Sequence, residues 1–180
     1  MFHKSLGRGL ELRQLEERDA ATALEAINRD RADLRKWLAW VDRNTSLDDT
    51  LAFIRAEVEK HTATAELAAG IWFEKRFAGT IGTHVIDRLN RKVEIGYWLG
   101  TPFRGRGIMT DACRAVVEYC LHELDLNRVE IRCAAGNLAS RAIPARLGFT
   151  HEATLHEAQL LYDMYHDLEI WRMLRKDFRV

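Results

Sequence analysis

Residues 93–124 constrain the fold of this chain more than any other segment. An apolar, strand-like run comes first, a turn with two glycines and two arginines follows it, and an amphipathic helix pattern begins at Gly107. This order places the amide groups of the turn and the positive end of the helix around one point, which favours an anion. Gly105 and Gly107 let the main chain approach a ligand closely, because they lack a Cβ atom and tolerate a positive φ. The segment therefore predicts a phosphate-binding turn, with positive charge added at its edge by Arg104 and Arg106.

Two better-known glycine-rich motifs do not fit this turn. A dinucleotide-binding fingerprint requires a third glycine, and this chain has Thr110 in its place. A P-loop requires four residues between its glycines and a following Gly-Lys-Ser/Thr, which the turn lacks. For a glycine pair taken alone, a plain helix-capping loop is the usual alternative.

The neighbouring residues resemble a third pattern. Arg104-x-x-Gly107-x-Met109 is similar to the Arg/Gln-x-x-Gly-x-Gly/Ala acetyl-CoA motif of the GNAT N-acetyltransferase superfamily. The preceding segment, residues 94–99, looks like the RimJ/RimL branch of that superfamily, which acetylates the N-termini of ribosomal proteins. Met109 stands where the superfamily often has Gly or Ala, and RimL-like sequences accept Ile or Met there.

The resemblance covers nearly the whole chain, roughly residues 9–175. Asn137-x-x-Ser140 and residues 146–149 look like the next cofactor segment of the same branch. Residues 37–42 resemble its substrate-side segment.

The hydrophobic periodicity predicts an α+β fold, and the resemblance makes it a GNAT fold in a single acetyl-CoA-dependent domain over residues 1–180. Such a fold has a mixed, mostly antiparallel sheet of about seven strands, with helices on both faces and a splayed central strand pair. Strands are expected at residues 10–15, 67–74, 78–87, 91–99, 129–134, 149–157 and 165–175, after a mobile N-terminal tail. Helices are expected at residues 17–40 with a break near 28–33, and at 47–61, 107–124 and 138–147. Short turns at 76–79 and 88–91 predict antiparallel neighbours, and the strand–helix–strand order from 93 to 134 predicts a parallel crossover.

Charge and cysteine content exclude several classes of protein. The 27 basic and 27 acidic residues balance, which argues against a general nucleic-acid-binding protein. Cys113, Cys120 and Cys133 form no close pairs, so no disulfide framework is predicted, and Cys113 and Cys120, seven apart on the predicted helix, are expected in the core. No signal peptide opens the chain and no apolar run reaches membrane-spanning length, so a cytoplasmic protein is expected. No Cys/His cluster has zinc spacing, so no metal is predicted.

The cofactor contacts follow from the resemblance. In GNAT proteins the fourth strand bends away from the fifth, and the pantetheine arm lies in the gap as an extra strand would. With acetyl-CoA as co-substrate, the expected cofactor-binding residues are Tyr97, Trp98, Leu99, Arg104, Gly105, Arg106, Gly107, Ile108, Met109 and Asn137. Tyr97 and Trp98 also suit core positions, and both interpretations hold if the cofactor contacts use main chain. Asn137 can in addition cap the helix that follows it.

The catalytic residues are a proton acceptor and a proton donor. An amine is mostly protonated near pH 7, so its attack on the thioester requires a base. RimL-like enzymes carry a glutamate on the strand after residues 148–149, where this chain has Gln159, and a neutral amide cannot take a proton. Glu157, two residues earlier and therefore expected on the same strand face, and Glu94 are the remaining candidates, each with a salt-bridged or solvated carboxylate as the alternative. The resemblance makes Ser140 the donor to the CoA thiolate, against the alternative of a plain surface serine.

The acceptor side has fewer signals. The resemblance implies that Trp37 and Trp40, on a helical segment, line the acceptor cleft with Gln159 and Tyr162, although a tryptophan pair at this spacing is more often core. The branch implies direct acetylation, in a ternary complex, of the N-terminal α-amine of a ribosomal protein. Polyamines, aminoglycosides or amino acid derivatives are alternative acceptors, and a non-catalytic acyl-CoA sensor is the alternative outside enzymes. Neither nucleic acid nor membrane is an expected partner, and a homodimer is left open.

Overall fold

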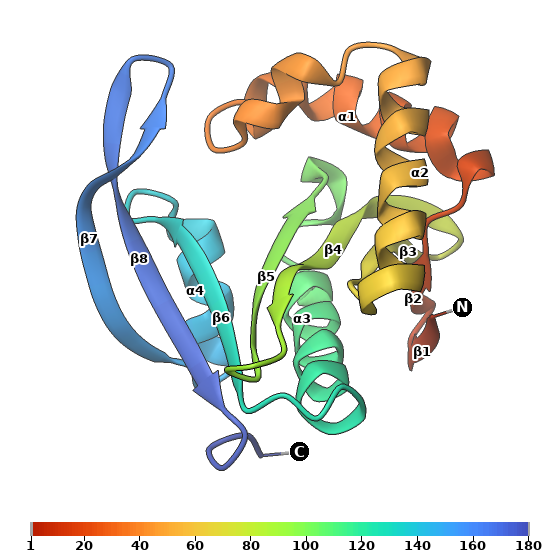
Figure 1. Ribbon diagram of the computed structural model, residues 1–180. Coiled ribbons are helices and arrows are strands. Elements are labelled where there is room, and N and C mark those ends of the chain that lie inside the picture. Colours follow the sequence, from red (N-terminus) through yellow and green to blue (C-terminus); the bar gives the residue numbers. More distant parts are fainter. Residues whose placement is uncertain (1, 180) are drawn as a thin grey trace. The chain divides into compact units, whose positions relative to one another are not determined.

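The computed structural model describes residues 2–179 and divides the chain into two compact units. Unit 1 consists of Met1–Gly82 and Tyr97–Ala112, and unit 2 consists of Thr83–Gly96 and Cys113–Val180. Three elements, all labelled in Figure 1, contribute residues to both units: β4 (Arg76–Asp87), β5 (Lys92–Leu99) and α3 (Ile108–Glu118).

Unit 1 contains antiparallel strands, which are β1 (His3–Gly7), β2 (Leu10–Gln14), β3 (Ala68–Phe73) and the first part of β4. Along β2, buried and half-buried residues alternate, which is the pattern of a strand with one face on the core. The expectation of a mobile tail before residue 10 is wrong, because β1 pairs with β2. Gly7, Arg8 and Gly9 have φ values of 79°, 52° and 74° and turn the chain back, so the two glycines were a missed hairpin signal.

The helices of unit 1 are α1 (Ala20–Leu34) and α2 (Leu47–Thr64), with short 3₁₀ turns η1 (Glu17–Asp19) and η2 (Ala39–Arg43). α1 packs against α2, and α2 also packs against β3 (Figure 1). Their buried faces share one hydrophobic core with aromatic side chains of the strands and with residues of the connecting segments. The buried residues of this core are Leu15, Ala20, Ala23, Ala26, Ile27, Leu34, Val41, Ile54, Trp72, Phe77 and Trp98.

The expected break in the first helix near residues 28–33 is wrong, since α1 continues to Leu34. Asn28 and Asp33 did not end the helix because their side chains have other partners. Asn28 accepts hydrogen bonds from Arg31, and Asp33 forms an ion pair with Lys36. Neither side chain then competes for the backbone groups of the helix.

The hairpin between β3 and β4 turns earlier than the predicted residues 76–79. Glu74 and Lys75 form the turn, with φ values of 50° and 64°. The prediction followed Gly79, which instead lies inside β4. A Cβ atom added to Gly79 would lie 2.2 Å from Trp98 O, so this glycine permits a close approach of two strands rather than a turn.

Unit 2 contains β6 (Arg128–Ala134), α4 (Leu138–Arg146), β7 (Thr150–Leu161) and β8 (Met164–Leu174). β5 and β6 are parallel, as predicted, whereas β8 is antiparallel to both β6 and β7, and α4 packs against β6 and β7. The strand order is β1-β2-β3-β4-β5-β6-β8-β7, which confirms the α+β class with a mixed, mostly antiparallel sheet, here of eight strands.

The central parallel pair is short. Lys92–Glu94 of β5 pair with Arg128–Glu130 of β6, and both strands continue beyond this paired segment, to Leu99 and Ala134. A short register of this kind agrees with the splayed pair that the sequence predicted.

A bulge interrupts β7 near the predicted site. The register with β8 shifts between Leu155 and Gln159, so that three residues of β7 lie opposite Asp167. Glu157 lies in this bulge with a φ of 49°. The regular alternation of sides is interrupted by such a bulge, so the strand geometry from which Glu157 and Gln159 were expected to share a face does not hold at this place.

The helix expected over residues 107–124 changes type near its end. α3 is α-helical to Glu118 and is followed by a π-helical turn, Tyr119–Glu123, in which Leu124 N donates to Tyr119 O at 3.0 Å. All three cysteines are free, as predicted, and Cys113 and Cys120 are buried as predicted; Cys133 is buried as well. Within residues 2–179, no helix is both long enough and apolar enough to cross a membrane.

Candidate functional site

The glycine turn of unit 1 has the conformation that a phosphate-binding turn needs. Gly105 and Gly107 have φ values of 74° and 78°, and a Cβ atom added to either would meet no protein atom within 4 Å. Asp111 N donates to Gly107 O at 3.0 Å, which begins the helical hydrogen bonds of α3. The amides of residues 108–110 precede that bond and lie at the positive end of the helix. The main chain here is therefore open to an anionic ligand.

The two arginines of the turn have partners that the sequence did not reveal. Arg104 forms an ion pair with Asp33 of α1, at 2.5 Å, and its Nε donates to Leu99 O at 3.1 Å. Hydrogen bonds from Lys36 and Arg104 lower the pKa of Asp33, so that carboxylate stays charged. Arg106 lies over the ring of Phe73, 5.8 Å from its centroid. Arg104 thus fastens the turn to α1 as well as adding positive charge.

Several predicted cofactor residues of unit 1 have buried side chains. Ile108 is 2% and Met109 5% exposed, so only their main-chain amides remain for a ligand. Trp98 is 8% exposed and packs between Trp40 and Phe77, with ring centroids 6.4 Å and 6.0 Å away. The core interpretation is therefore correct for the Trp98 side chain, and a cofactor contact there would use main chain. Tyr97 and Leu99, its half-buried neighbours on β5, lie beyond the segment that pairs with β6.

In unit 2, Asn137 has the capping role that the sequence allowed. Its side-chain oxygen accepts a hydrogen bond from Ser140 N at 3.2 Å at the start of α4. The Ser140 hydroxyl hydrogen bonds to the Cys133 thiol on β6, which lowers the pKa of that thiol, whereas burial, the larger effect, raises it to about 11. Because Ser140 takes part in the cap through its main chain, its hydroxyl is not needed there.

The candidate bases differ in environment. Burial raises the pKa of Glu94, while Arg132 of β6, at 3.3 Å, and His84 of β4 act in the opposite direction. A half-buried carboxylate with a raised pKa has the properties of a general base. Glu157 is exposed in the β7 bulge, and its amide donates to Asp167 at 2.9 Å. The surroundings therefore favour Glu94.

The predicted acceptor residues fall in both units. In unit 2, Gln159 lies in β7, and Tyr162, which is 45% exposed, occupies the turn before β8 at the tip of a long hairpin (Figure 1). In unit 1, Trp37 lies in the turn after α1 and Trp40 in η2, so the single helical segment expected for them is wrong. Leu38 between them is extended, with φ −127° and ψ 94°, which separates the two turns.

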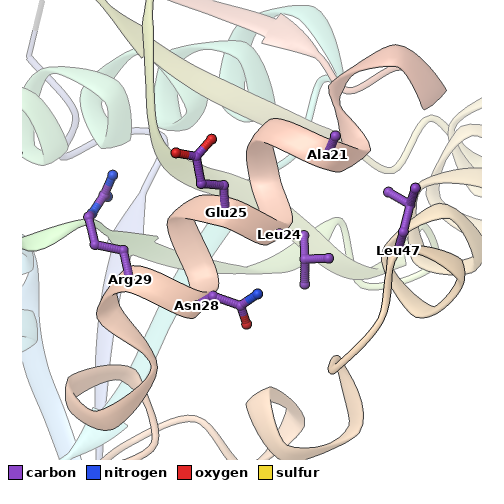
Figure 2. Close-up of a pocket in the computed structure, with 6 residues that line it drawn as sticks. All are labelled: Ala21, Leu24, Glu25, Asn28, Arg29 and Leu47. Atoms are coloured by element: carbon purple, nitrogen blue, oxygen red, sulfur yellow. The ribbon is translucent and has the colours of Figure 1, made fainter.

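A surface hollow of about 530 Å³ in unit 1 was not predicted. Figure 2 shows the residues that line it, which come from one side of α1 and from the start of α2: Ala21, Leu24, Glu25, Asn28, Arg29 and Leu47. None of the predicted site residues lines this hollow.

Two further groups in unit 2 escaped the sequence analysis. The carboxylate of Glu169 on β8 is buried and accepts hydrogen bonds from Arg141 of α4, at 2.8 Å, and from Trp171, at 2.9 Å. Gly96 on β5 lies against the ring of His84. The contact between Gly96 and His84 had one available signal in the sequence, which is the glycine inside a strand. Such a glycine often marks a place where another group approaches the main chain closely.

Comparison with known proteins identifies the relatives of this chain. Residues 9–150 match the acetyltransferase (GNAT) domain family. YdaF of Bacillus subtilis, which carries the name "Putative ribosomal N-acetyltransferase", is 35% identical over 99% of this chain and 98% of its own length.

Two solved structures are similar over nearly their whole length. RimL, described as a ribosomal L7/L12 α-N-protein acetyltransferase in complex with coenzyme A, has a TM-score of 0.91 at 27% identity and covers 94% of this chain and 96% of its own. The microcin C7 self-immunity acetyltransferase MccE, in complex with acetyl-CoA and AMP, has a TM-score of 0.89 at 26% identity and covers 94% of each chain.

Proposed function

The chain belongs to the GNAT acetyltransferase family, and we propose that it transfers the acetyl group of acetyl-CoA to the N-terminal α-amine of a ribosomal protein. The observation that carries this proposal is the open, left-handed glycine turn at the start of α3, inside the segment that matches the family. The relatives named for ribosomal proteins, YdaF and RimL, support the acceptor. In this proposal residues 1–180 act as a single acetyltransferase domain.

The proposed cofactor contacts are mostly main-chain contacts. The amides at the start of α3 and the turn at Gly105 and Gly107 would hold the pyrophosphate, because these amides form the positive end of the helix and the space beside both glycines is open. In unit 1 the main chain of residues 97–99 would contact the pantetheine arm. In unit 2 the side-chain amide of Asn137 is a second proposed cofactor contact. The complexes of RimL with coenzyme A and of MccE with acetyl-CoA support a CoA ligand.

The proposed chemistry uses two side chains. Glu94 takes the proton of the amine, directly or through a water, as the nitrogen attacks the thioester carbonyl. The C–S bond then breaks, and Ser140 gives a proton to the CoA thiolate and takes one back from solvent, which restores its hydroxyl. A protein α-amine has an unperturbed pKa near 8, whereas a lysine or polyamine amine lies near 10. An α-amine therefore makes the smaller demand on a carboxylate base, which supports an N-terminal acceptor.

An acceptor screen tests this proposal. The protein is incubated with acetyl-CoA and separated ribosomal proteins, and each product is read by intact mass and then by its N-terminal peptide. We expect a gain of one acetyl group, located on the α-amine. Acetylation confined to lysine side chains, or no acetylation of any ribosomal protein, would contradict the proposal.

A small-molecule acceptor is the second candidate, because MccE is described as a self-immunity acetyltransferase and binds AMP beside acetyl-CoA. A parallel panel of polyamines, aminoglycosides and amino acid derivatives, read by thiol release, discriminates the two. Turnover on one of these amines without turnover on ribosomal proteins would favour this candidate.

Replacing Gly107 by valine should raise the Kd for CoA about tenfold or more, roughly 1.4 kcal/mol, measured by calorimetry. An added Cβ atom meets no protein atom within 4 Å, so the expected loss comes from the valine side chain occupying the space of the bound pyrophosphate and from strain at a positive φ. Gly7→Val is the matched control, because Gly7 has a φ of 79° and equally open surroundings but lies in the β1–β2 turn. We expect Gly7→Val to bind CoA normally; equal losses in both variants, or none in a folded Gly107→Val protein, would contradict the phosphate-binding turn.

A further inference from the structure

A glycine on β5 makes room for a histidine ring on β4. A Cβ atom added to Gly96 would lie 2.3 Å from His84 Nε2 and 3.0 Å from His84 Cδ2. No real Cβ atom lies so close to a ring, so any other residue at Gly96 would displace the imidazole. Both residues belong to unit 2, and His84 is exposed to solvent. The imidazole therefore lies over the main chain of β5, with access to water.

The same side of β5 carries Glu94. Glu94 and Gly96 are two residues apart in a strand, so they face the same side, and the ring of His84 lies next in the row after Glu94. From β6, Arg132 approaches the Glu94 carboxylate to 3.3 Å. Among the described residues, the charged groups that act on Glu94 are His84 from β4 and Arg132 and Glu130 from β6. His84 and Arg132 lower the pKa of Glu94, and Glu130 raises it together with burial.

We propose that His84 is a positioning residue for Glu94, which keeps the carboxylate ready to accept a proton and passes that proton to solvent. This inference rests on the proposed function, in which Glu94 takes the proton of the acceptor amine. The proton leaves the amine nitrogen for Glu94 and moves from Glu94 to the neutral imidazole. The imidazolium formed in this way favours the Glu94 carboxylate until it releases the proton to water. No other bond changes in these steps. Histidine suits the task because a ring nitrogen can accept a proton and later donate it, and Arg132 cannot do so because a guanidinium stays protonated.

Two variants remove this arrangement in different ways. His84→Gln keeps a polar side chain but no group that titrates, and Gly96→Ala keeps the imidazole but displaces it from the strand. His122→Gln is the control for loss of a histidine, because His122 lies in the π-helical turn against Phe178. Melting temperatures identify any variant that has lost its fold.

Two measurements then test the proposal. The first is the titration of the Glu94 carboxyl carbon by NMR in the free protein, which needs no substrate. Loss of the imidazole removes an interaction that favours the carboxylate, so the titration should move to higher pH in His84→Gln and in Gly96→Ala. The second is the pH profile of kcat/KM and kcat. The acidic limb of this profile should also move to higher pH in both variants. We expect kcat to fall severalfold and the Kd for acetyl-CoA to stay unchanged.

The outcomes separate this inference from the proposed function. If the Glu94 titration does not move in either variant while the parent enzyme acetylates its acceptor, the role of His84 is overturned and the proposed function stands. If the titration moves but the rate profile does not, the role of His84 in the reaction is overturned, because Glu94 is then not the base. In a Glu94→Gln background, His84→Gln should change the rate no further; an additive loss would also overturn the inference, because His84 would then act independently of Glu94.

Discussion

Replacing Glu94 by glutamine should lower kcat by about 10²-fold or more and leave the Kd for acetyl-CoA unchanged. Glutamine keeps the shape of the side chain but cannot accept the proton of the amine. Because burial raises the pKa of Glu94, the parent enzyme should lose activity as the pH falls through that raised value, where the carboxylate becomes protonated. The variant should lack this acidic limb. Thiol release from acetyl-CoA, recorded against pH with a saturating acceptor, measures both effects.

Glu157 and Gln159 supply the controls for this result. Glu157→Gln should keep the parent profile, because that side chain is exposed in a bulge. Gln159→Glu restores the carboxylate that RimL-like sequences carry and tests whether that position of β7 contributes. A parent-like profile in Glu94→Gln would exclude Glu94 as the base. A lost acidic limb in Glu157→Gln instead would assign the base to the β7 bulge.

Replacing Ser140 by alanine should lower kcat on the order of 10²-fold, with acetyl-CoA binding nearly intact. The expected loss comes from the missing proton for the CoA thiolate, and a water that replaces the hydroxyl would reduce it. The cap of α4 should survive, because Asn137 accepts its hydrogen bond from the main-chain amide of Ser140. Single-turnover rates on preformed enzyme–acetyl-CoA complexes measure the chemical step directly.

Asn137→Ala is the matched control for the structural role of this segment. It removes the cap and should destabilise the protein by about 1 kcal/mol, measured by denaturant unfolding. If Ser140→Ala lowers stability as much as Asn137→Ala and leaves kcat unchanged, Ser140 is a structural residue of α4 only. Cys133→Ala removes the partner of the hydroxyl and shows whether that hydrogen bond orients it.

Most of the fold followed from the sequence because most strands and helices have a regular apolar period, the turns between them are short, and the motifs resemble those of the GNAT family. The errors lie where a local sequence pattern indicates one structure and the contacts of the folded protein favour another. Gly79 was read as a turn residue, although it permits the close approach of β4 to Trp98, a contact that only the folded sheet creates. The break assigned to α1 near Asn28 failed because the polar side chains there find partners on the helix surface. The bulge at Glu157 could not be predicted, because the sequence of an extended segment does not show the register in which it pairs with its neighbour.

The candidate site likewise contains residues that could be placed from the sequence and contacts that could not. Gly105, Gly107 and Asn137 could be placed from sequence, because their conformations depend on neighbours in the chain. The ion-pair partners of Arg104 and Glu94 could not, because Asp33 and Arg132 come from other elements. No sequence pattern around His84 predicts its contact with β5. The available sign of that contact is Gly96 on the neighbouring strand.

The Glu74–Lys75 turn has a practical consequence for engineering. Both residues adopt left-handed φ values that side chains with a Cβ atom disfavour by roughly 1 kcal/mol each, and Asn-Gly is the pair that such two-residue hairpins prefer. The natural sequence is therefore not optimised for heat resistance at this position, which no site residue occupies. A thermostabilised parent carrying Asn-Gly at this turn would tolerate substitutions in the active centre that unfold the natural chain, and would widen the range of acceptor specificities open to directed evolution.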